Sequence, residues 1–147
     1  VAQGATTWFL IDIEKRRIAR YPQDIMDVII LGNELDHLQR PEKLPAVSME
    51  DTQHIMEDFK VRYHDLDFNH HLNNNVYIRW LLDTLPEKWW QAHRLQELQM
   101  KFVEEGKYGE YIRIGLSKEE EGTHLFQIRK VDRSMAEGKM TWQKRDS

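Results

Sequence analysis

Residues 61–86 read VRYHDLDFNHHLNNNVYIRWLLDTLP and contain, in order, the end of a strand, a polar loop and an apolar helix. The apolar positions of the last part recur at helical spacing: Tyr77, Trp80, Leu81 and Leu85. This period predicts a helix over residues 76–85, with Asn73 or Asn74 as its N-cap and Pro86 at its end. The helix is apolar on nearly all sides, so we expect it to be buried.

Segments with a two-residue apolar period surround this helix. Ahead of it, Phe59, Val61 and Tyr63 alternate with charged residues, as in a half-buried strand. The segments after it cover residues 98–102, 112–116, 125–131 and 140–142. Glycines lie in or near the breaks between them: Gly106, Gly109, Gly122 and Gly138. The order predicts an α+β fold in which an antiparallel sheet wraps around one long buried helix.

The N-terminal part of the chain has a different character. Residues 6–20 read TTWFLIDIEKRRIAR, a run rich in bulky apolar residues followed by a charged turn and a short return, which predicts a strand or a hairpin. Residues 22–52 are interrupted by Pro22, Pro41 and Pro45, and no apolar period persists beyond residues 25–31. We therefore expect a connector with one short helix there.

Composition narrows the class of protein. The chain has 147 residues and a mass of 17.7 kDa, the size of one domain with part of another. A formal net charge of −4 argues against a protein that neutralises nucleic-acid phosphates, and no apolar run is long enough to cross a bilayer. The absence of Cys excludes disulfides, thiolate metal sites and a cysteine nucleophile.

Polar side chains gather between residues 64 and 75, in HDLDFNHHLNNN. Asp67, Asn69 and His71 alternate, so an extended backbone would direct all three to the same side. A carboxylate, an amide and an imidazole could then deprotonate a water and polarise a carbonyl. Turn formation and helix capping explain the same residue types. A metal site is a third interpretation, with these possible ligands: His64, Asp65, Asp67, His70 and His71.

The same residues resemble the signature of the acyl-acyl-carrier-protein thioesterases, which belong to the hot-dog superfamily. The matching positions are Asp67, Asn69, His71, Asn73, Asn74, Tyr77 and Trp80. A second element also agrees, because an alternating segment leads to Glu105 and a Gly109–Glu110 turn. The resemblance implies a catalytic site of Asp67, Asn69, His71 and Glu105, with Glu104 as the match if the register differs by one. Gly106 stands where many plant members have Cys.

The resemblance also implies an activity and a domain organisation. The expected reaction is hydrolysis of fatty acyl thioesters of acyl carrier protein to free fatty acid, without cofactor or metal, in the bacterial cytoplasm or the plastid stroma. Residues 1–21 would be closing strands of a mostly missing first hot-dog unit, residues 22–55 a connector and residues 56–147 the catalytic unit. The expected partner is acyl carrier protein, with no nucleic acid or membrane. An apolar strand around Trp8 and Phe9 needs cover, so we expect a homodimer.

In the mechanism expected from this resemblance, Asp67 or Glu105 is the base or nucleophile and His71 holds or shuttles the proton. Asn69 and the helix N–H groups would stabilise the oxyanion. Three other functions fit the same residues. The first is an acyl-coenzyme A hydrolase in which Asp65 would be the nucleophile or base. The others are a non-catalytic acyl-binding or assembly module and a hot-dog dehydratase.

Basic residues raise a separate question of partners. Lys15, Arg16, Arg17 and Arg20 would either receive an acidic carrier protein or form a solvated hairpin tip. Arg62 would pair with Asp65, contact a phosphopantetheine phosphate, or be an ordinary surface or ion-pair group.

Overall fold

The computed structural model describes residues 4, 6, 10–12, 14–15, 17–28, 43–45, 47–48, 50–131 and 133–145. The chain divides into two compact units, residues 1–42 and 43–147, and we describe each by itself. Among the described residues, no helix has both the length and the apolar character needed to cross a membrane.

The first unit contains the predicted hairpin and the predicted short helix. Strand β1 (Ile11–Asp12) pairs antiparallel with β2 (Arg17–Ile18), and helix α1 (Gln23–Val28) follows. The Asp12 carboxylate accepts a hydrogen bond from the backbone N–H of Lys15 at 2.9 Å, which closes the turn. The remaining residues expected in the apolar strand and basic turn lie outside the described residues: Trp8, Phe9, Ile13 and Arg16.

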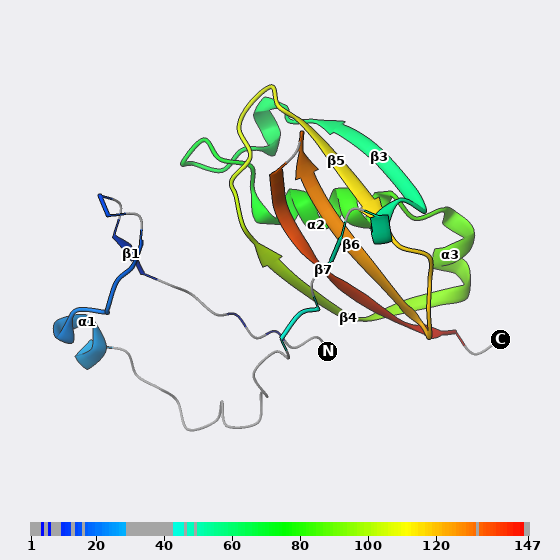
Figure 1. The fold of residues 1–147 in the computed structure, drawn as a ribbon, viewed down its shortest axis with the longest axis horizontal. Coiled ribbons are helices and arrows are strands. Elements are labelled where there is room, and N and C mark those ends of the chain that lie inside the picture. Colours follow the sequence, from blue (N-terminus) through cyan, green and yellow to red (C-terminus); the bar gives the residue numbers. More distant parts are fainter. Residues whose placement is uncertain are drawn as a thin grey trace. The chain divides into compact units, whose positions relative to one another are not determined.

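The second unit is built on one five-stranded antiparallel sheet (Figure 1). Its strands are β3 (Ile55–Lys60), β4 (His93–Phe102), β5 (Tyr111–Leu116), β6 (Thr123–Lys130) and β7 (Arg133–Lys144). Their order across the sheet is β3-β5-β6-β7-β4, and every neighbouring pair is antiparallel. The strands predicted after the helix are therefore confirmed. Gly138 lies inside β7 rather than in a break. Glycine suits this position because an added Cβ would clash with the Gln99 carbonyl oxygen of the neighbouring strand.

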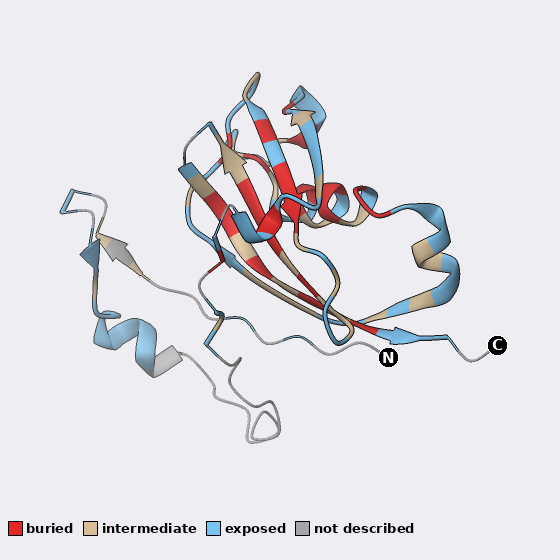
Figure 2. Ribbon diagram, turned by 45° about the vertical axis from the view of Figure 1, so that its right-hand side comes forward, coloured by how far each residue is buried: buried red, intermediate tan, exposed pale blue. Residues whose placement is uncertain are grey.

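Helix α2 (Asn74–Asp83) packs against one face of this sheet, and buried residues line the facing surfaces (Figure 2). Its buried side chains are Val76, Tyr77, Trp80 and Leu81. The Trp80 ring stacks on Phe59 of β3, with ring centroids 5.0 Å apart. Arg79 and Asp83 are exposed, so the helix is buried on one side rather than all round. Asn73 is the N-cap, and its side chain accepts the backbone N–H of Asn75 at 2.9 Å.

Two local predictions were wrong at their ends. Strand β3 ends at Lys60, and Tyr63 is 76% exposed in a short 3-10 turn, η3 (Tyr63–Asp65). The chain leaves the strand there because the Asp65 carboxylate accepts the backbone N–H of Arg62 at 2.9 Å. Helix α2 begins and ends two residues earlier than predicted, and a further helix that was not predicted, α3 (Glu87–Ala92), follows Pro86, which is its N-cap.

The segment before β3 also packs on the sheet. The 3-10 turn η2 (Glu50–Thr52) buries Thr52, and the Val47 carbonyl accepts a hydrogen bond from the buried Gln127 amide at 3.2 Å. The backbone N–H of His54 donates to the Leu116 carbonyl at 3.0 Å. The last residues of the expected connector therefore belong to the second unit.

Candidate active site

The polar loop ahead of α2 is anchored by one buried carboxylate. Asp65 is 2% exposed and accepts hydrogen bonds from the Arg62 backbone and, at 2.8 Å, from Arg79 Nη2. Its carbonyl accepts the backbone N–H of Asn73, the N-cap of α2. Arg79 rather than Arg62 therefore forms the side-chain pair with Asp65, which ties the loop to the first turns of the helix.

Residues 67–71 form a tight turn, not the extended segment predicted from the alternation. The Asp67 Oδ1 atom accepts the backbone N–H of Asn69 at 2.8 Å and that of His71 at 3.1 Å. The backbone N–H of Asp67 donates to the His71 carbonyl at 2.8 Å, and His70 has a positive φ of 62°. The short Asp side chain supplies local acceptors that compete with extended pairing, which explains the difference.

A second segment, residues 103–107, runs alongside this turn. His71 forms an antiparallel bridge with Lys107, and the Leu72 N–H donates to the Gly106 carbonyl at 2.8 Å. On the other side, the backbone N–H groups of Val103 and Glu104 both donate to the Met135 carbonyl of β7. These contacts hold the region after β4 beside the loop ahead of α2.

The two segments bring an imidazole and a carboxylate together. His71 Nδ1 lies 3.2 Å from Glu105 Oε2, and the two side chains are 36% and 68% exposed. The neighbouring Glu104 instead faces Arg133, with 3.6 Å between Oε1 and Nη1. Glu105 is therefore the acidic residue at His71, and the one-position alternative, Glu104, lies against a different partner. A carboxylate at this distance can orient the imidazole through Nδ1, with Nε2 on the other side of the ring.

The remaining predicted residues lie close by in the chain and differ in their contacts. Asp67 reaches His71 through its backbone N–H, and Asn69 is an exposed residue of the turn. The N-terminus of α2 follows directly; the Asn73 side chain and carbonyl there accept the N–H groups of Asn75 and Val76, and the helix dipole favours negative charge. The structure thus joins Asp67, His71 and Glu105 by hydrogen bond or close contact. Asn69 bonds Asp67 through its backbone N–H and is exposed to solvent.

The sequence reasoning missed the role of Tyr77. Its spacing indicated core packing, and the ring is indeed 1% exposed, but its hydroxyl accepts the Gly106 N–H at 3.0 Å and donates to the Glu104 carbonyl at 3.5 Å. Burial raises the pKa of Tyr77 to about 12, although the hydrogen bond from Gly106 opposes the shift. The available signal was a tyrosine, with its polar atom, on an otherwise apolar helix face.

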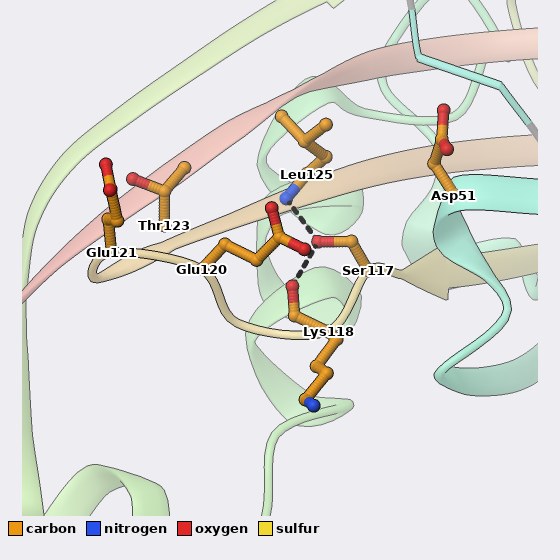
Figure 3. A pocket seen from close by; sticks show the side chains of 7 residues that line it. All are labelled: Asp51, Ser117, Lys118, Glu120, Glu121, Thr123 and Leu125. Atoms are coloured by element: carbon orange, nitrogen blue, oxygen red, sulfur yellow. Dashed lines mark hydrogen bonds between the residues drawn. The ribbon is translucent and has the colours of Figure 1, made fainter.

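The rest of the second unit offers a pocket but no candidate metal site among the described residues. Within the described ranges, no three His, Asp or Glu side chains are grouped as metal ligands. An open pocket lies at the opposite end of β5 from the His71–Lys107 bridge, between Asp51 and the β5–β6 connection (Figure 3). There, the Ser117 hydroxyl donates to the Lys118 carbonyl and accepts the Leu125 N–H, so its hydrogen bonds serve the turn.

Comparisons with known proteins identify the family and the fold of the chain. Residues 48–144 match the family model of the acyl-ACP thioesterase C-terminal domain. The chloroplastic oleoyl-acyl carrier protein thioesterase 1 of Arabidopsis thaliana is 27% identical over 111 residues, which are 70% of this chain and 30% of the relative. The chain thus spans about 30% of the length of that curated relative.

Two solved structures show the same fold. The 12:0-ACP thioesterase from Umbellularia californica superposes with a TM-score of 0.75 at 16% identity, over 92% of this chain and 53% of that one. An acyl-ACP thioesterase from Bacteroides thetaiotaomicron superposes with a TM-score of 0.73 at 22% identity, over 90% of this chain and 53% of that one. The predicted hot-dog fold is confirmed. With its family model matched from residue 48 to residue 144, the chain belongs to the acyl-ACP thioesterase family, through the C-terminal domain.

Proposed function

We propose that this chain carries the reactive groups of a thioesterase that hydrolyses fatty acyl thioesters of acyl carrier protein to free fatty acid. The observation that carries the proposal is the 3.2 Å contact between His71 Nδ1 and Glu105 Oε2, made by two segments far apart in the sequence. Family membership supports the reaction class, and the names of the relatives support a carrier-protein thioester as substrate.

In the proposed mechanism, the Glu105 carboxylate accepts the Nδ1–H of His71 and orients the ring. Nε2 then removes a proton from a water, whose oxygen attacks the thioester carbonyl carbon. The carbonyl π electrons move to oxygen, and the resulting oxyanion expels the thiolate as the C–S bond breaks. The imidazolium returns its proton to that thiolate, which leaves a free acid and a phosphopantetheine thiol.

Asp67 and Asn69 have supporting roles in this proposal. The Asp67 carboxylate accepts the backbone N–H of His71 and so fixes the backbone position from which the imidazole extends. Asn69, exposed on the same turn, offers an amide donor to the developing oxyanion, and the N-terminus of α2 adds a partial positive charge. Donors held in advance stabilise the oxyanion without reorganisation during the reaction.

The domain organisation belongs to the same proposal. The two solved structures are matched over 53% of their lengths, which supports a protein with a further unit of similar size. We propose that residues 1–21 are closing strands of such a unit and that a second copy of the chain covers their apolar face. Sedimentation of the purified chain tests the second point, since a monomer at micromolar concentration would contradict it.

The test of function measures thiol release from lauroyl and oleoyl groups, each carried on acyl carrier protein and on coenzyme A. We expect the carrier-protein thioesters to be preferred. Glu105→Gln and His71→Gln should each lower kcat/KM about a hundredfold or more. Glu104→Gln is the matched control, and we expect it to stay within about threefold because its partner Arg133 is exposed. No turnover by the wild-type chain, or full rates in both site variants, would contradict the proposal.

A further inference from the structure

The Tyr77 hydroxyl needs an explanation that packing does not provide. The ring is buried in α2 and meets Phe102 of β4 edge-on, with centroids 5.7 Å apart. A phenylalanine would fill the same space. The hydroxyl nevertheless accepts the Gly106 N–H and donates to the Glu104 carbonyl, two groups of a loop outside the helix.

Those two hydrogen bonds flank Glu105 on either side. The other backbone bonds to the loop come from Met135 at Val103 and Glu104, and from Leu72 at Gly106. Among the hydrogen bonds of the described residues, those of the Tyr77 hydroxyl connect the residue before Glu105 to the residue after it. The hydroxyl therefore holds the backbone on both sides of Glu105, whose carboxylate contacts His71.

The glycine after Glu105 allows this close approach. A Cβ at Gly106 would lie 2.9 Å from the Cβ of Leu72, closer than real Cβ contacts allow. Without a side chain, Gly106 can accept from Leu72 and donate to Tyr77 at the same time. An ordinary tyrosine is already protonated in the neutral range, and because burial raises the pKa of Tyr77 to about 12, its hydroxyl keeps the proton for donation well above that range.

We propose that Tyr77 is a positioning residue that sets the distance from the Glu105 carboxylate to His71 by fixing the loop backbone on both sides of Glu105. This inference rests on the proposed function. Loss of the hydroxyl leaves the buried Gly106 N–H without its acceptor, and the loop must move to find another. A carboxylate attached to a displaced backbone no longer orients the imidazole, and misplacements of about 1 Å cost about a hundredfold in rate.

The first test compares Tyr77→Phe with Tyr111→Phe, a control whose side chain is exposed on β5. We expect Tyr77→Phe to lower kcat about ten- to a hundredfold with KM nearly unchanged, and the control to match wild type. In a Glu105→Gln background the same change should cost nothing further, because the hydroxyl acts through Glu105. An equal loss of kcat in both backgrounds would overturn the proposal.

The second test does not depend on turnover. The ring nitrogen resonances of His71, followed by NMR, should move in the same direction in Tyr77→Phe and in Glu105→Gln, and stay in place in Tyr111→Phe. Unmoved resonances in Tyr77→Phe would overturn the proposal. If Glu105→Gln retained full hydrolysis, the proposed function would fail, while these resonances would still report whether Tyr77 positions Glu105.

The wild-type chain provides a third measurement in case Tyr77→Phe does not fold. The buried Gly106 amide proton, held by the Tyr77 hydroxyl, should exchange slowly with solvent and show a cross-peak to the ring of Tyr77. Rapid exchange of this amide would overturn the proposal without any variant.

Discussion

Replacing Asp65 by Asn tests whether this carboxylate stabilises the fold or takes part in the reaction. Asp65 is 2% exposed and accepts from the Arg62 backbone at 2.9 Å and from Arg79 Nη2 at 2.8 Å. An Asn side chain has one acceptor oxygen, so one of these donors faces an NH₂ group instead. The loop that it anchors leads directly to Asp67 and His71, which makes the distinction important for the site.

The magnitude follows from burial and from the partner. A hydrogen bond to a charged group contributes roughly 1.5–3 kcal/mol, and removing one member of a buried pair can cost roughly 3–5 kcal/mol. The Arg79 side chain is 53% exposed and can turn to water, which reduces the loss. We therefore expect Asp65→Asn to lower the free energy of unfolding by about 2 kcal/mol, roughly 8–16 °C in Tm for a unit of this size.

The matched control is Asp58→Asn on the sheet. Asp58 also pairs with an arginine, Arg113, at 2.7 and 2.8 Å, but both side chains are more than half exposed. The hydrogen bond from Arg113 lowers the pKa of Asp58, yet solvent screening limits such a pair to about 0–1 kcal/mol. We expect Tm to fall by no more than roughly 8 °C, less than for Asp65→Asn.

The assay is urea unfolding followed by tryptophan fluorescence, with kcat measured at a temperature where all variants are folded. Asp65→Asn should unfold at clearly lower urea than Asp58→Asn and keep most of its kcat. Equal midpoints for the two variants would refute the burial argument. If Asp65→Asn kept wild-type stability but lost hydrolysis, Asp65 would take part in the reaction, as the acyl-coenzyme A hydrolase hypothesis states.

Two further predictions concern packing and pH. Gly106→Ala should lower the free energy of unfolding by about 1–3 kcal/mol, because its Cβ would meet Leu72 at 2.9 Å and the backbone must shift; an unchanged thermal melt would contradict this. Burial lowers the pKa of His124 below 6.5, so the folded state resists protonation that the unfolded chain accepts. Neutral His124 therefore does not lower the free energy of unfolding above about pH 6.5. As pH falls from there toward the folded pKa, the free energy of unfolding decreases by up to about 1.4 kcal/mol per pH unit. His124→Phe should flatten the pH dependence of Tm in that range, and an unaltered slope would count against the argument.

Much of the fold could be predicted from local patterns. The two-residue period of the strands and the helical spacing of Tyr77, Trp80 and Leu81 state which faces are buried, since each period belongs to one backbone geometry. Asn73 was predictable as a cap because its side chain bonds a neighbouring N–H. The ends were harder. Strand β3 stops at Lys60 because a carboxylate further along the chain, Asp65, accepts the Arg62 N–H, and no period encodes that contact.

The sequence by itself determined the residue types of the candidate site and, through the alternating strands and the apolar helix, the layer to which each belongs. Only the tertiary structure decided that Glu105 rather than Glu104 meets His71, that Asp65 is buried against Arg79, and that the Tyr77 hydroxyl holds the loop. Periodicity reports a local backbone geometry, whereas these three contacts join segments far apart in the chain. They depend on how β4, β7 and α2 pack, and a shift of one position exchanges one carboxylate for its neighbour.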